Sequence, residues 1–105
     1  MRQFTSTASI RTQSGERYLQ QLCKHWSHNL EVELTEGRGS VVFPKDLRGA
    51  EFPSDAIVTF TSTDHALEVR IEASSSGQLE NLQGVVARHL DRFAFREAPL
   101  NFSWK

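Results

Sequence analysis

The chain has 105 residues, 38% of them hydrophobic and 24% charged, which is typical of a soluble globular chain with a single core and predicts one domain over residues 1–105. Twelve lysines and arginines face 13 acidic residues, and a net charge near −1 argues against a nucleic-acid binder, because neutralising phosphates requires a cationic surplus. The single cysteine excludes an internal disulfide, and without an apolar run of about 18 residues we expect no membrane association, no signal peptide and a cytoplasmic location.

The chain begins with an alternating stretch, followed by an amphipathic one. Residues Phe4–Arg11 alternate with period two, which predicts a half-solvated strand. The segment Ser14–Asn29 repeats its apolar residues at spacings of three and four, which predicts a helix. Ser14 is placed to cap its first turn through the side-chain oxygen. One face of this helix collects Tyr18, Leu19, Leu22, Cys23 and Trp26.

The middle of the chain predicts four consecutive antiparallel strands. Their alternation is strict, and a turn with two glycines joins the first two of them. The connection Pro44–Asp55 is long for a hairpin, and long ordered loops are often functional. We expect Leu47 and Phe52 to hold this loop against the body. The predicted strands are Leu30–Glu36, Ser40–Phe43, Ala56–Thr61 and Ala66–Ala73.

A second amphipathic helix and an alternating tail end the chain. Ser75 and Gln78 match a capping box, in which each side chain serves the other residue's backbone N–H. Pro99 prevents the helix from continuing, and the tail Leu100–Trp104 predicts a C-terminal edge strand. The apolar stripe of the helix is Leu79, Leu82, Val86, Leu90 and Phe93, with His89 at its border.

The spacing Cys-x-His-x-x-His in the first helix looks like a metal motif, but helical geometry separates its members. Cys23 points about 160° from His25 and about 140° from His28, so no metal cluster is predicted. We expect Cys23 to behave as a buried hydrophobic residue and His28 to be solvated. His25 and His28 are only about 60° apart and are the one metal-like pair.

No pattern in the sequence indicates catalysis or a cofactor. Glu31 and Glu33 lie side by side on the expected solvated face of a strand, where charge serves solubility. A phosphate-binding glycine loop, a Ser/His/Asp arrangement and a CxxC motif are all absent from the sequence. We therefore expect no catalytic residues and no cofactor.

Three stretches together resemble the bacterial family catalogued as domain of unknown function 2218. They are ERYLQQLCKHWSHN, ALEVRIEASSSGQLENLQGVV and RHLDRFAFRE with the terminal Trp104. The loop Pro44–Asp55 is longer than the family pattern. The first-helix motif corresponds to Arg17, Tyr18, Leu19, Cys23 and His25, and the second motif to His89, Arg92, Phe93, Phe95, Arg96 and Glu97.

The resemblance implies a TBP-like β-α-β-β-β-β-α fold, with both helices on one face of a curved antiparallel sheet. It also implies an accessory role in iron–siderophore handling, because such domains occur beside or fused to siderophore-interacting flavin reductases. The periodicity analysis agrees with this α+β fold. If both helices share one sheet face, their flanks meet along a seam.

That seam is the candidate site. His25 and His89 both fall at polar–apolar borders, so we expect their rings to approach each other, with Arg17 and Arg92 at the rim and Tyr18 nearby. A cationic, imidazole-lined seam suits a small anionic ligand or an anionic metal chelate. In the alternative, each histidine donates to a backbone carbonyl and the arginines pair with acids, namely Glu16, Asp91 or Glu97.

Three classes of function follow. The first is a non-catalytic accessory or ligand-binding domain, which the candidate site favours. The second is a protein-interaction module, in which the tail with Phe102 and Trp104 pairs with a second copy or with a siderophore-interacting reductase. The third is a small enzyme or a small metal-binding or haem-binding protein.

Overall fold

The computed structural model describes residues 4–98 and 100–105, and its elements follow the order β-α-β-β-β-β-α that the sequence predicts. A single 3-10 turn, η1, lies inside the long loop between the third and fourth strands. The elements are β1 (Phe4–Arg11), α1 (Gly15–Trp26), β2 (Glu31–Thr35), β3 (Arg38–Phe43), η1 (Leu47–Gly49), β4 (Ala56–Ser62), β5 (Ala66–Ala73) and α2 (Ser76–Phe93).

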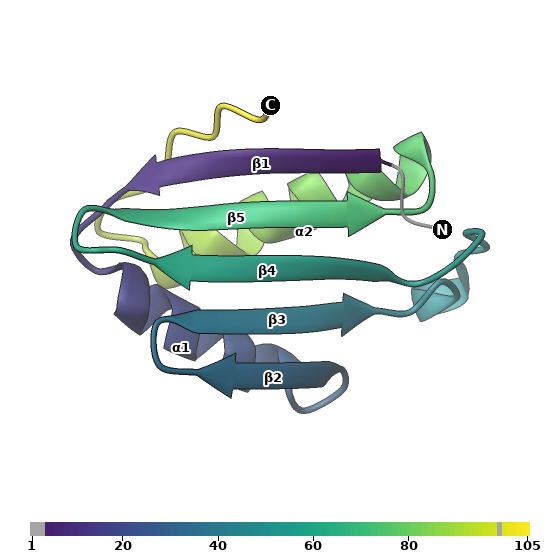
Figure 1. Ribbon diagram of the computed structural model, residues 1–105, viewed down its shortest axis with the longest axis horizontal. Coiled ribbons are helices and arrows are strands. Elements are labelled where there is room, and N and C mark those ends of the chain that lie inside the picture. Colours follow the sequence, from purple (N-terminus) through teal and green to yellow (C-terminus); the bar gives the residue numbers. More distant parts are fainter. Residues whose placement is uncertain (1–3, 99) are drawn as a thin grey trace.

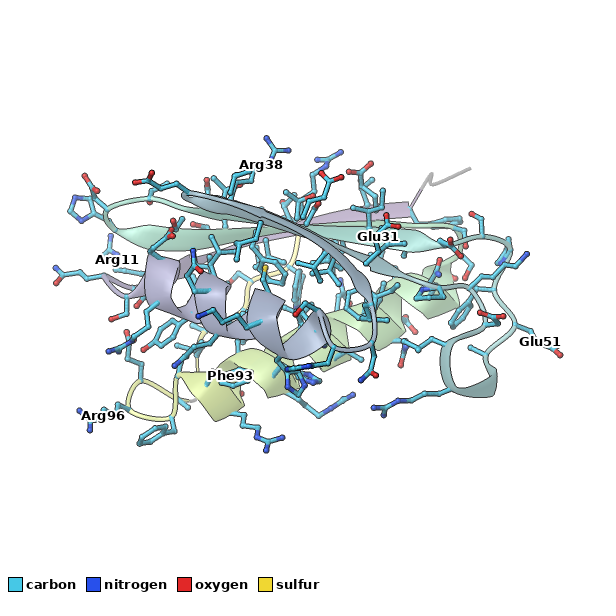
Figure 2. The ribbon with its side chains drawn as sticks, turned by 90° about the horizontal axis from the view of Figure 1, so that it is seen from below. Arg11, Glu31, Arg38, Glu51, Phe93 and Arg96 are labelled. Carbon is cyan, nitrogen blue, oxygen red and sulfur yellow. The ribbon has the colours of Figure 1, made fainter. Side chains whose placement is uncertain are left out.

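The strands form one antiparallel sheet in the order β1-β5-β4-β3-β2 (Figure 1). Strands β2 to β5 are neighbours in sequence and in space, which confirms the predicted run of four. β1 lies at the far edge because it pairs with β5, the last strand. Both helices cover the same face of the sheet (Figure 2), so the predicted α+β arrangement is confirmed.

The core fills the space between the sheet and the two helices. Inward-facing residues of the central strands are fully buried, among them Val41, Val58, Phe60 and Ile71, as the alternation predicts. Two apolar residues near the ends of the outer strands are more exposed: Phe4 is 41% exposed and Leu34 is 37% exposed. The buried helix residues are Gly15, Tyr18, Leu19, Leu22, Cys23 and Trp26 of α1 and Gln78, Leu82, Val86 and Leu90 of α2.

The start of α1 differs from its prediction. The Ser14 side chain makes no capping hydrogen bond, so the expected Ser14 cap is wrong. Instead the Ser14 backbone N–H donates to Thr12 Oγ1 at 3.0 Å, which orients the chain where it enters the helix. The helix also ends earlier than predicted, at Trp26, because the Leu30 N–H donates back to the Trp26 carbonyl at 2.8 Å and turns the chain into β2.

The start of α2 follows half of the predicted capping box. The Gln78 N–H donates to Ser75 Oγ at 3.1 Å, as expected. The return bond reaches one residue further, since the Ser74 N–H donates to Gln78 Oε1 at 2.7 Å. Gln78 Nε2 also donates to the Ser54 carbonyl at 3.0 Å, so this buried amide ties the helix to the loop before β4.

Replacing Gln78 by alanine is expected to lower the free energy of unfolding by about 2 kcal/mol, because it leaves the buried Ser74 N–H without its acceptor and removes one of the two donors to the Ser54 carbonyl. Urea denaturation measures the loss. Gln20→Ala is the matched control: Gln20 bonds only Glu16 at the surface, and its replacement should cost less than about 0.5 kcal/mol. Equal losses in both variants would contradict this account.

The loop Pro44–Asp55 folds back on itself. The Lys45 N–H donates to Asp55 Oδ1 at 2.8 Å, and the Phe52 N–H donates to the Lys45 carbonyl at 3.1 Å. Phe52 is half-buried, as predicted. Leu47 is 38% exposed, so the expectation that it holds the loop against the body is wrong.

The C-terminal tail is not a regular strand, although it does join the sheet edge. Lys105 and Thr7 of β1 exchange two backbone hydrogen bonds of 2.8 and 3.0 Å. Phe102 and Trp104 stack with ring centres 5.7 Å apart. The predicted edge strand is therefore reduced to one paired position beside β1 (Figure 1). The expected helix stop at Pro99 lies outside the described residues. Within the described ranges, neither helix is long and apolar enough to cross a membrane.

Candidate functional site

A groove of about 680 Å³ lies where the end of α1, the outer flank of α2 and the loop Pro44–Asp55 meet. This volume is within the range of small-molecule sites. The groove is lined by His25, Trp26, Asn29 and Leu30 from the end of α1 and the turn after it, by Phe43, Pro44, Leu47, Arg48, Gly49, Ala50 and Phe52 from β3 and the loop, and by Gln78, Asn81, Leu82, Val85, Arg88 and His89 from α2.

The two histidines predicted to approach each other do so in this groove. Their ring centres are 5.3 Å apart, with an angle of 49° between the planes. α1 and α2 run side by side in opposite directions (Figure 1), and the last turn of α1 lies beside the C-terminal part of α2, where His25 contacts both His89 and Phe93. His89 is half-buried, as its place at the border of the apolar stripe predicts, whereas His25 is exposed.

His89 is held by its own helix. Its Nδ1 lies 2.7 Å from the carbonyl oxygen of Val85, one turn earlier, so Nδ1 carries the proton and donates it to that carbonyl. The predicted alternative, in which each histidine donates to a backbone carbonyl, thus applies to Nδ1 of His89. In the neutral imidazole the other nitrogen, Nε2, is then a hydrogen-bond acceptor with a free lone pair.

Positive charge surrounds His25. Desolvation lowers the pKa of this histidine, and the neighbouring His89, Arg92 and His28 lower it further. Its imidazole is therefore neutral at pH 7, since its ordinary pKa is already about 6.5. Arg92 lies within electrostatic reach of the histidine pair, as predicted, although it does not line the groove.

The floor of the groove is aromatic. The Trp26 ring stacks on Phe60 at 5.9 Å between centres and meets Phe43 edge-on at 5.3 Å. The same indole lies 5.0 Å from the His89 ring. Because Phe60 is fully buried, it supports the indole from within the core, and Trp26, at 6% exposure, presents only a small part of its surface to the groove.

The walls of the groove carry positive charge and no negative charge. Arg48 and Arg88 line it, and none of its described lining residues is acidic. Glu51 of the same loop points away from the body (Figure 2). Arg48 also has a left-handed backbone, with φ 57°, a conformation that costs a residue with a side chain of order 1 kcal/mol and is often kept at binding sites.

The similarity to a known protein family extends over almost the whole chain. A family model matches residues 7–105. The chain belongs to the family described as "Uncharacterized protein conserved in bacteria (DUF2218)". A similar solved structure is the NMR structure of PA4090 from Pseudomonas aeruginosa, with a TM-score of 0.75 and 32% identity, over 97% of this chain and 95% of that one. A search of curated proteins finds no match.

Two residues that carried the DUF2218 resemblance form a contact of their own, away from the groove. The buried Tyr18 hydroxyl donates to Glu97 Oε2, and the Thr12 hydroxyl donates to the same oxygen at 3.0 Å. Burial raises the pKa of Tyr18, and the hydrogen bond to Glu97 raises it further. This contact ties the turn after α2 to the start of α1, so Tyr18 serves the fold of this DUF2218 chain.

Arg17 lies at the same end of the helix pair as Tyr18. Its guanidinium carbon is 5.6 Å from the Tyr18 ring centre, and it borders a smaller hollow of about 240 Å³ with Phe93 and Arg96. The structure therefore separates the predicted residues into two groups, with His25, His89 and Arg92 at one end of the seam and Arg17 and Tyr18 at the other. Among the described residues, neither Arg17 nor Arg92 makes a salt bridge, and the one ion pair is Arg70–Glu72 at 3.5 Å.

The structure also bears on the remaining sequence predictions about reactive and metal-binding side chains. Cys23 is buried, and desolvation raises the pKa of its thiol to about 11, so it is a neutral core residue as predicted. His28 is exposed, as predicted, and so are Glu31 and Glu33. Within residues 4–98 and 100–105, no group of three or more His, Cys, Asp or Glu side chains is arranged to hold a metal ion.

The sequence did not predict that the loop Pro44–Asp55 forms part of the groove. Arg48, Leu47 and Phe52 form one wall of the groove, opposite Asn81 and Arg88 of α2. The available indication was the length of the connection, which marked it as a functional candidate. The left-handed backbone at Arg48 has no equivalent indication, because arginine does not favour that conformation.

Proposed function

We propose that this chain is a non-catalytic accessory domain that binds a small anionic ligand with aromatic groups in the groove between α1, α2 and the loop Pro44–Asp55. The observation that carries this proposal is the lining of the groove: arginines and imidazoles stand over an aromatic floor, without an acidic residue among the described lining. A guanidinium binds a carboxylate or catecholate oxygen through charge-assisted hydrogen bonds.

The same lining supports binding in preference to chemistry. Its described residues offer two imidazoles and two guanidiniums, with no serine, cysteine or carboxylate beside them to act as a nucleophile or to orient a histidine base. The accessory role in iron–siderophore handling that the family resemblance implies fits this ligand class, because many ferric siderophores are anionic and carry aromatic rings. We include that role in the proposal.

The test compares two ferric siderophores of different charge. A ferric tris-catecholate is aromatic and trianionic, whereas a ferric trihydroxamate can be neutral and aliphatic. The proposal expects saturable binding of the tris-catecholate, seen as Trp fluorescence quenching and a raised melting temperature, and little binding of the neutral complex. Affinity should fall as salt rises, because part of it is electrostatic.

Single arginine variants localise the binding. Arg48→Ala and Arg88→Ala should each weaken the tris-catecholate about tenfold, as expected for the loss of one hydrogen bond to a charged group. Arg38→Ala is the matched control, because Arg38 projects from the sheet face opposite the helices (Figure 2). Equal weakening in all three variants, or equal binding of both siderophores, would overturn the proposal.

The protein-interaction alternative finds less support in the geometry. The backbone of the tail, which was expected to pair with another chain, is used at Lys105 by β1 of the same chain. At the opposite edge, β2 carries the exposed Glu31 and Glu33, and a second copy pairing there in antiparallel fashion would bring like charges together. The geometry therefore favours ligand binding over protein interaction.

A further inference from the structure

The distance between the two imidazoles in the groove is that of two ligands of one metal ion. A metal about 2.1 Å from a histidine nitrogen lies about 3.2 Å from the ring centre, so two imidazoles sharing it have centres about 4.5 Å apart at a right angle and about 5.2 Å apart at the tetrahedral angle. The observed separation of His25 and His89 is 5.3 Å. Because His25 is exposed, its side chain can turn to bring a ring nitrogen to a position shared with His89.

The hydrogen bond of His89 is the one that a metal-binding histidine needs. Ligating histidines commonly donate their other ring N–H to a carbonyl or carboxylate, which fixes the tautomer and the direction of the free lone pair. The Val85 carbonyl accepts from Nδ1 at 2.7 Å and does this for His89. Among the described residues, no hydrogen bond is formed by Nε2 of His89 or by either ring nitrogen of His25.

The residues around His25 and His89 determine which kind of metal species can bind there. The described residues supply no third metal ligand beside these two imidazoles, so the remaining coordination positions need donors from outside the protein. Arg88 and Arg92 stand near the pair and oppose a bare cation, whereas they favour a metal that arrives with carboxylates and a net negative charge.

We infer that His25 and His89 together coordinate the metal of an anionic chelate, a divalent transition-metal ion that is held by a carboxylate-bearing ligand and has two adjacent free positions. Imidazole suits nickel, copper, zinc and iron alike. This inference rests on the proposed function for the neutralisation of the ligand by the groove arginines. It adds direct bonds to the metal, which a coordinatively saturated ferric siderophore cannot accept.

The test uses two complexes of the same metal. Ni²⁺–nitrilotriacetate is anionic and leaves two adjacent positions for protein ligands, whereas Ni²⁺–EDTA is anionic with its positions filled. Titration calorimetry and the visible absorption of nickel should show one Ni²⁺–nitrilotriacetate bound per chain and no coordination of Ni²⁺–EDTA. Equal binding of the two complexes would overturn the inference.

Histidine variants decide which pair binds. Losing one of two linked ligands removes the benefit of chelation, so His25→Ala and His89→Gln should each weaken Ni²⁺–nitrilotriacetate about 100-fold. His28→Ala is the matched control and should leave binding unchanged. His89→Gln keeps a polar side chain of similar length, and circular dichroism checks its fold. If His28→Ala abolishes binding and His89→Gln does not, the surface pair His25–His28 is the site and the inference fails.

The two proposals fail separately. Binding of the ferric tris-catecholate without coordination of Ni²⁺–nitrilotriacetate would retain the anion-binding groove and remove the metal-bonding role of the histidines. Coordination of the nickel complex that is unaffected by Arg88→Ala would retain the histidine pair and remove the role of the arginine in neutralising the ligand.

Discussion

Replacing Phe60 by alanine is expected to lower the free energy of unfolding by about 4 kcal/mol. Phe60 is fully buried at the centre of β4, with Val69 of β5 and Gly39 of β3 as its cross-strand neighbours. Its ring also supports Trp26, at 5.9 Å between centres. Alanine would leave a cavity under the floor of the groove, and the surrounding residues of a sheet cannot move enough to fill it.

Guanidinium denaturation with circular dichroism measures this loss. Thr59→Ala, one residue earlier on the same strand, is the matched control, because Thr59 faces the uncovered side of the sheet and should cost less than about 1 kcal/mol. The fluorescence of Trp26 should shift to longer wavelength in Phe60→Ala as the indole gains water. Equal destabilisation by Phe60→Ala and Thr59→Ala would show that the packing of Phe60 under Trp26 contributes little to the free energy of unfolding.

Replacing Gly39 by alanine is expected to cost about 3 kcal/mol, because the sheet and α1 come too close there for a methyl group. A Cβ built at Gly39 would lie 2.5 Å from Cys23 Sγ and 3.0 Å from Leu19 Cδ1, both on the buried face of α1. The helix would have to rise from the sheet, and His25 and Trp26 would rise with it. Ligand affinity should therefore fall together with stability.

A double variant tests that cause. In a Cys23→Ala background the sulfur is gone, so Gly39→Ala should cost at least about 1 kcal/mol less than it does in the native chain, a coupling that a double-mutant cycle measures. Gly77→Ala in the first turn of α2 is the control, since its added Cβ would meet its nearest neighbour, Phe52, only at 4.0 Å. An unchanged cost of Gly39→Ala in the two backgrounds would assign the strain to Leu19 instead.

The sequence predicts most of this fold because its two periodicities are clean. Phe4–Arg11 and Ala66–Ala73 have the predicted bounds, since both strands alternate without interruption and have one face in the core. The errors lie at the ends of elements, because single hydrogen bonds decide where an element begins or ends. Thr12 replaces Ser14 as the side-chain partner at the start of α1, and no periodicity contains that information.

The candidate site is predictable only in part. The meeting of His25 and His89 follows from two helical wheels and one shared sheet face. The helix direction decides the rest: because α1 and α2 are antiparallel, Arg17 lies at the opposite end of the seam from the histidines. The wall formed by Arg48 depends on an irregular loop with a left-handed residue, and neither pattern nor spacing determines such a path.

The loop Pro44–Asp55 also bears on how relatives of this domain can diverge. Its two ends are joined by the pairing of β3 with β4 and by the bond from Lys45 to Asp55. Insertions or deletions between those anchors would change the mouth of the groove while the strand register stays as it is. Selection for new ligands can therefore act on the residues between those anchors without disturbing the scaffold, and grafting this segment between homologues offers a direct route to altered selectivity.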